Sequence, residues 1–118
     1  MAPTLENIAF DCTDAAALAG FWSQLLDKPV DPDATEFFAS IGRGTMSPTL
    51  MFLKVPERNP GKNVVHLDLV APDWREQIER AVSLGAKHVD DHDEYGIQWA
   101  TLADPEGNLF DIAKAERA

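Results

Sequence analysis

The stretch HLDLVAPD at residues 66–73 repeats the pattern of NIAFDCTD at residues 7–14, at an offset of 59 residues. In each stretch a strand-like alternation runs into an aspartate suited to begin a helix. A helical pattern and further strand patterns follow each copy. A repeat of this size predicts two supersecondary units that share one core.

The first half predicts one strand, one helix and then two more strands. The first strand covers residues 5–12, and Asp14 is placed to cap the helix that follows. The helix has an apolar face at helical spacing, made of Leu18, Phe21, Trp22 and Leu25. Residues 35–41 and 49–55 read as strands.

The second half repeats this order. Residues 63–70 read as a strand, and Asp73 with Glu76 resembles a capping box at the start of a helix that ends near Gly85. Strands are predicted at residues 98–102 and 109–113, joined by a hairpin turn at 104–108. The acidic stretch 87–94, which contains His88 and His92, is predicted to be a solvated loop rather than a metal-binding one.

The predicted fold class is α+β: two βαβββ units forming a curved mixed sheet around a concave pocket, with helices on the outer face. The chain is expected to be a single domain over residues 1–118. Unit one covers about 4–55, a breaker-rich linker covers 56–62, and unit two covers about 63–114.

Charge and cysteine content restrict the partners. The formal net charge is −10, which would repel phosphate backbones and anionic lipid, so neither nucleic acid nor membrane is an expected partner. The N-terminus lacks the basic and apolar blocks of a signal peptide. The lone Cys12 cannot pair within the chain, and it favours the reducing cytoplasm.

Strand alternation selects the candidate site residues. His66 and Asp68 share one face of their strand, and the apolar Val65, Leu67 and Leu69 share the other. The same alternation places Asp111 on the concave side of the last strand. It also places Asn7 and Asp11 on the concave side of the first strand. Asp11 and Asp68 are interpreted as separately solvated, with a carboxylate pair for acid–base work as the alternative.

This order of elements resembles the vicinal oxygen chelate superfamily, which contains glyoxalases, bleomycin-resistance proteins and dioxygenases. The stretch VHLDL at 65–69 and the run from Trp99 to Asp111, with LADPEGN at 102–108, carry the resemblance. In metal-dependent members, ligands come from the first and last strands of the units. Carried onto this chain, those positions are Asn7, Leu53, His66 and Asp111, and Leu53 cannot bind a metal.

The resemblance therefore implies a bacterial, cytoplasmic homodimer that binds a small organic molecule without a tightly bound metal or other cofactor, as antibiotic-sequestering members do. Trp99 is a candidate wall for a planar or cationic ligand, although core packing explains it equally well. One alternative is a lyase, isomerase or dioxygenase that uses a metal on His66 and Asp111. Another is a vestigial structural or regulatory module. Whether the chain is an enzyme stays open.

Overall fold

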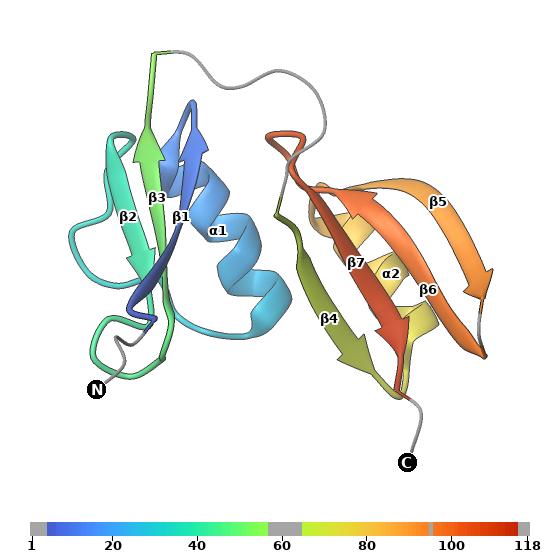
Figure 1. Cartoon of the computed structure of the whole chain (residues 1–118). Helices are drawn as coiled ribbons and strands as arrows, with labels where there is room; N and C mark the ends of the chain where they lie inside the picture. The colour runs from blue at the N-terminus through green and yellow to red at the C-terminus, as the bar shows by residue number, and fades with distance from the viewer. Residues whose placement is uncertain (1–4, 57–64, 95, 116–118) are drawn as a thin grey trace. The chain divides into compact units, whose positions relative to one another are not determined.

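A computed structural model describes residues 5–56, 65–94 and 96–115 (Figure 1). The chain divides into two compact units, residues 1–58 and residues 59–118, and each is described by itself. Together they confirm the predicted α+β class, because each unit has the βαβββ-type order with one helix and one mixed sheet. No helix in the described part of the chain is long and apolar enough to span a membrane.

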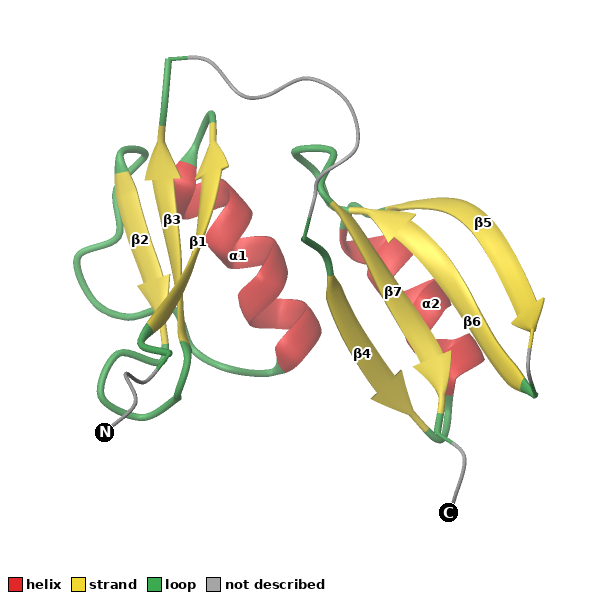
Figure 2. Ribbon diagram, viewed as in Figure 1, coloured by secondary structure: helices red, strands yellow, loops and turns green. Residues whose placement is uncertain are grey.

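Unit 1 contains a three-stranded sheet covered on one face by a helix (Figure 2). Its elements are β1 (Asn7–Cys12), α1 (Ala15–Leu26), β2 (Phe38–Ile41) and β3 (Thr49–Lys54). The strand order is β1-β3-β2, with β1 parallel and β2 antiparallel to β3. An isolated bridge between Val30 and Ile41 stands where a fourth strand would pair with β2.

Helix α1 forms where the capping pattern predicts it. Asp14 accepts a hydrogen bond from the Ala17 amide at 3.1 Å, which satisfies one of the first-turn amides. Trp22 of α1 is fully buried and contacts Phe10 with ring centroids 5.7 Å apart. Phe10 in turn stacks on Phe52 at 5.0 Å. Phe10 therefore faces the helix, on the side of β1 opposite to Asn7 and Asp11.

Unit 2 contains a four-stranded sheet in the order β4-β7-β6-β5, covered on one face by α2. Its elements are β4 (Leu67–Ala71), α2 (Trp74–Leu84), β5 (Lys87–Glu94), β6 (Ile97–Ala103) and β7 (Leu109–Lys114). The β4–β7 pair is parallel, and the other two pairs are antiparallel.

The two ends of α2 differ from each other in how well the sequence predicts them. The expected capping box is wrong, because Asp73 makes no capping bond and accepts instead from Gln77 Nε2 at 3.0 Å. Gly85 ends the helix as predicted, with a φ of 125° that favours glycine.

The predicted turn at 104–108 is also present, because buried Asp104 accepts from the Glu106 and Asn108 amides, both at 2.9 Å.

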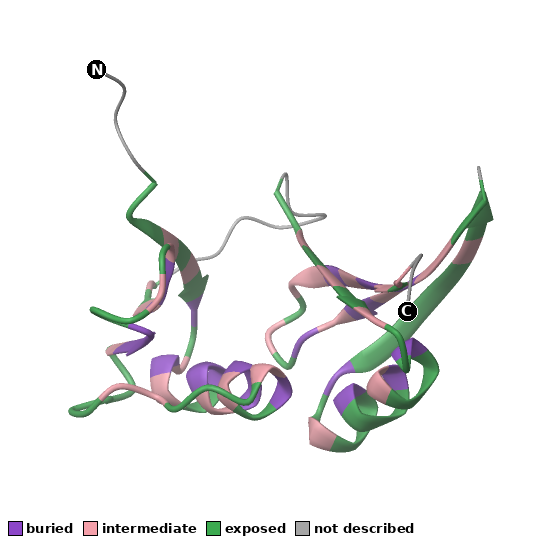
Figure 3. Ribbon diagram, turned by 90° about the horizontal axis from the view of Figure 1, so that it is seen from below, coloured by how far each residue is buried: buried purple, intermediate pink, exposed green. Residues whose placement is uncertain are grey.

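The predicted solvated loop at 87–94 is wrong, because this stretch is β5 and pairs along β6. β5 is an edge strand, exposed at nearly every position (Figure 3), and charged side chains are common on such edges. Three other strands begin later than predicted, at Asn7, Phe38 and Leu67. Val65 precedes β4 and is exposed rather than packed on the helix side. The expected linker 56–62 lies, apart from Pro56, outside the described residues.

Candidate functional site

The sheet of unit 2 has an apolar face against α2 and a polar face turned away from it, called here the open face. Ala100, Leu102, Phe110 and Ile112 are at most 1% exposed on the helix side. Residues alternate across a strand, so the open face receives the residues between them. The polar and aromatic residues on the open face are Asp68 of β4, Asp111 of β7, Trp99 and Thr101 of β6, and Asp90 and His92 of β5. Val70 and Ala113 lie on the same face.

A histidine and two aspartates meet where β4 pairs with β7. His66 Nδ1 lies 3.1 Å from Asp68 Oδ1 and 3.7 Å from Asp111 Oδ2. Asp68 and Asp111 are directly paired across the two strands, which brings their side chains together. The His66 and Asp68 side chains are 42% and 67% exposed, whereas that of Asp111 is 18% exposed. Exposed ion pairs contribute only about 0–1 kcal/mol to stability, so folding alone gives little reason for this cluster.

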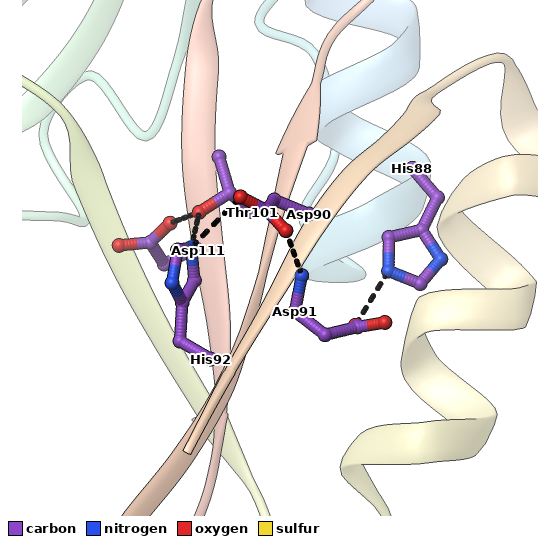
Figure 4. A network of polar contacts seen from close by, with 6 residues as sticks. All are labelled: His88, Asp90, Asp91, His92, Thr101 and Asp111. Carbon is purple, nitrogen blue, oxygen red and sulfur yellow. Dashed lines mark hydrogen bonds and ion pairs between the residues drawn. The ribbon is translucent and has the colours of Figure 1, made fainter. Parts of the chain in front are cut away.

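The polar contacts continue from Asp111 across β6 to β5 (Figure 4). Thr101 Oγ1 donates a hydrogen bond to Asp111 Oδ1 at 2.7 Å. His92 Nε2 lies 3.2 Å from the same Thr101 oxygen and 4.0 Å from Asp90 Oδ2. The result is a row of polar side chains that crosses all four strands of the sheet.

The direction of these hydrogen bonds follows from the chemistry of the hydroxyl group. Thr101 has one hydroxyl proton, and it is directed to the Asp111 carboxylate. The Thr101 oxygen can then only accept from His92, so Nε2 of His92 carries a proton. The three side chains form a chain of donors that runs from β5 to β7.

Trp99 lies beside this row and stacks on His92. The two residues are directly opposite each other on β6 and β5, with ring centroids 4.8 Å apart and planes inclined by 20°. Such a pair presents a flat aromatic surface next to hydrogen-bonding groups. Trp99 is therefore part of the open face and not of the core under α2.

Comparison with known families identifies the domain. The profile of the glyoxalase-like domain family matches residues 7–113. The chain belongs to that family. No curated protein matches the chain significantly. Membership confirms the resemblance to the glyoxalase, bleomycin-resistance and dioxygenase superfamily.

Solved structures share the fold of this glyoxalase-like domain at low sequence identity. A glyoxalase/bleomycin resistance protein/dioxygenase family enzyme from Burkholderia phytofirmans PsJN superposes with a TM-score of 0.80 at 17% identity, covering 94% of this chain and 98% of that one. The lactoylglutathione lyase of Agrobacterium tumefaciens gives 0.67 at 14%, covering 96% and 94%. The bleomycin-binding protein of Streptomyces verticillus, solved with copper(II)-bleomycin, gives 0.65 at 17%, covering 98% and 100%.

The structure brings four of the six predicted site residues onto one face of unit 2: His66, Asp68, Trp99 and Asp111. Asn7 and Asp11 lie in unit 1 on the exposed side of β1, as the alternation predicts. Sequence reasoning did not select Thr101 or His92. Thr101 follows Trp99 by two residues, so alternation along β6 could have found it. His92 had no such signal, because β5 lacks an apolar alternation.

The glyoxalase-like domain has one set of donors, among its described residues, with the chemistry to hold a divalent cation. The ligand atoms of His66, Asp68 and Asp111 all lie within 4.8 Å of one another. Neighbouring ligand atoms around an ion with bonds of about 2.1 Å are separated by roughly 3 Å. The 3.1 Å between His66 and Asp68 is close to that spacing. These three residues would hold an ion, which would supply Lewis-acid polarisation of a bound oxygen.

Unit 1 provides no equivalent acid on its last strand. The two helices begin 59 residues apart, so Asp68 corresponds to Ala9 in the other unit. Asp68 pairs with Asp111, whereas Ala9 pairs with Met51. Strand pairing thus makes Met51, rather than Leu53, the counterpart of Asp111. Neither side chain offers an oxygen or imidazole ligand.

Proposed function

We propose that this glyoxalase-like domain binds a small organic cation carrying a planar ring on the open face of unit 2, without requiring a tightly bound metal. One observation carries the proposal: the stacked Trp99–His92 pair lies beside the row that leads through Thr101 to Asp111. An aromatic surface and a carboxylate are the two groups that recognise such a ligand.

The distances on the sheet suit a ligand of modest size. Trp99 and Thr101 are two residues apart on β6, about 7 Å along a strand, and Thr101 is directly opposite Asp111. A ring and an ammonium group joined by a short linker can therefore reach both. The net charge of −10 adds a favourable long-range field for a cation.

The function of one relative supports the same class of activity. The Streptomyces verticillus protein with this fold binds bleomycin, which shows that the fold can serve as a small-molecule binder. We extend this to the present chain as a proposal that it sequesters an antibiotic or a similar compound.

Titration calorimetry in the presence of EDTA tests the proposal. Tryptamine is an aromatic cation, and tryptophol has the same ring and linker but a neutral hydroxyl group. We expect tryptamine to bind more tightly, and Asp111→Asn to lower its affinity about five- to tenfold, the loss of a charge-assisted contact. Glu79→Gln, an exposed acid on α2, is the control and should have no effect. Equal affinities for the two compounds, or no effect of Asp111→Asn, would refute the proposal.

The second candidate function is a metal-dependent lyase, isomerase or dioxygenase, which the spacing of His66, Asp68 and Asp111 favours. Elemental analysis of untagged protein separates the two candidates. Our proposal expects no stoichiometric transition metal, because two of the three donors are exposed to water. One zinc, nickel or iron per chain that survives dialysis would favour the enzyme instead.

The assembly and cellular location of the chain are also proposals. We propose a single-domain chain over residues 1–118 that forms a cytoplasmic homodimer, on the basis of the family and of the lone Cys12. Light scattering on a sizing column gives the mass in solution, and a monomer of 13.0 kDa would refute the dimer.

A further inference from the structure

We infer that His92 is a positioning residue that organises both parts of the ligand site, holding Trp99 by stacking and Asp111 through Thr101. The inference rests on the proposed function for its ligand, but its structural half can be tested on the free protein. It adds β5, one edge strand of the sheet, to a site that sequence patterns place on β4, β6 and β7 alone.

His92 has the contacts that such a role requires. Its ring stacks on the Trp99 ring, with the centroids 4.8 Å apart. Its Nε2 lies 3.2 Å from Thr101 Oγ1 (Figure 4). Asp90 Oδ2, at 4.0 Å from Nε2, is a weaker third partner. The side chain is 28% exposed, so it is partly enclosed by these neighbours while one edge still faces solvent.

A β-bulge places His92 on the open face. His88 pairs with Leu102, but Asp90 pairs with Thr101, so Val89 is the extra residue in β5. If Val89 were paired regularly with Thr101, with no bulge, His92 would lie opposite Gln98, on the side of the buried Ala100 and Leu102. The bulge turns the last part of β5 over and brings His92 opposite Trp99. Bulges commonly re-aim a side chain in this way.

The direction of the hydrogen-bond chain gives His92 its effect on Asp111. Because His92 donates to Thr101, the Thr101 hydroxyl proton stays directed at Asp111 Oδ1. That bond fixes the carboxylate and leaves Oδ2 for His66 or a ligand cation. A fixed anion binds a cation better than a mobile one, because less side-chain entropy is lost on binding.

Two substitutions separate the roles of the ring and the donor. His92→Phe keeps the stack and removes the donor, whereas His92→Gln keeps a donor and removes the stack. We expect His92→Phe to lower tryptamine affinity about three- to tenfold with tryptophol affinity unchanged. We expect His92→Gln to weaken both compounds by a similar factor, so that their ratio is retained. His88→Phe on the same strand is the matched control, because His88 contacts Asp91 and not Thr101.

A double-mutant cycle shows whether His92 acts through Thr101. In a Thr101→Val background, His92→Phe should cause no further loss of tryptamine affinity. Additive losses would mean that the two residues act independently, and they would overturn the inference. The inference would also be overturned if His92→Phe left the ratio of tryptamine affinity to tryptophol affinity unchanged.

A measurement without any ligand completes the test. Nitrogen NMR of the free protein, above the pH at which its histidines titrate, should show His92 with its proton on Nε2. The Thr101→Val variant should lose that preference. A proton on Nδ1 in the native protein would overturn the inference directly. If native protein fails to bind tryptamine but His92 is protonated on Nε2, the proposed function fails and the structural half of the inference holds.

Discussion

At the scale of single residues, Trp99 and Trp74 separate a binding role from a packing role. Trp99 lies on the open face against His92, whereas Trp74 is 8% exposed at the start of α2 beneath Arg75. We expect Trp99→Ala to lower tryptamine affinity about five- to a hundredfold, the usual effect of losing a stacking aromatic. Trp74→Ala should lower the melting temperature instead. Calorimetry and thermal unfolding of both variants distinguish these effects, and equal losses of affinity would contradict the assignment.

Asp31 predicts a pH dependence of stability in unit 1. Partial burial raises the pKa of this carboxyl, but hydrogen bonds from Ser40 Oγ at 2.7 Å and from the Arg43 and Gly42 amides, together with the Arg43 charge, hold its pKa below the usual 3.8. Because the pKa of Asp31 is lower in the folded protein than in the unfolded chain, the ionised carboxylate stabilises the fold at a pH above the pKa of the unfolded chain. This stabilisation is lost as the pH falls through the pKa of the folded protein.

Asp31→Asn should therefore reduce the free energy of unfolding by about 1 kcal/mol at neutral pH, since the hydrogen bonds to a charged acceptor are weakened. The difference from the native protein should shrink below pH 3.8. Urea unfolding curves from pH 7 to pH 3 measure this, with Asp33→Asn as a control on an exposed acid in the same loop. A difference that grows as the pH falls would show the sign to be wrong.

At the scale of elements, the two helix starts differ in a way that mutation can measure. Asp14 accepts from the Ala17 amide, whereas Asp73 makes no capping bond. Asp14→Ala should therefore lower the free energy of unfolding by about 1 kcal/mol. Asp73→Ala should cost less, because only its contact with Gln77 is removed. Denaturant unfolding of both variants is the measurement, and a larger effect at Asp73 would contradict the capping geometry.

The sequence correctly predicts the helices and strands whose apolar residues recur at a regular spacing. Both helices and the inner strands alternate or repeat at helical spacing, and their buried residues follow that spacing. β5 was missed because it carries four acids among eight residues and shows no apolar alternation. An edge strand needs little apolar surface, so its pattern is that of a loop. The bulge at Val89 was equally hidden, since no residue type marks it.

At the scale of the whole chain, the family could be predicted from the order of the motifs, and the profile match over residues 7–113 confirms it. The site was predicted in part, because alternation selected His66, Asp68 and Asp111 without showing how close they lie. His92 and Thr101 extend that cluster through contacts that depend on strand register. Register is set by pairing between distant segments, and a single sequence does not display it.

The net charge of the chain predicts a salt dependence of binding. With a formal charge of −10, attraction of a cation by the whole protein should weaken as salt screens it. We expect tryptamine affinity to fall severalfold between 0.02 and about 0.5 M sodium chloride, with tryptophol affinity nearly constant. Calorimetric titrations at several salt concentrations measure this, and a parallel change for both compounds would argue against a charge effect.

The most direct test of the central claim is an NMR titration of metal-free, nitrogen-labelled protein with tryptamine. If the ligand binds the open face of unit 2, the largest shift changes should fall on Trp99, Thr101 and Asp111, including the Trp99 indole N–H. They should occur with EDTA present, and Asp111→Asn should reduce them while Glu79→Gln leaves them intact. Shift changes confined to α2 or to unit 1, or changes that appear only after a divalent metal is added, would contradict the account.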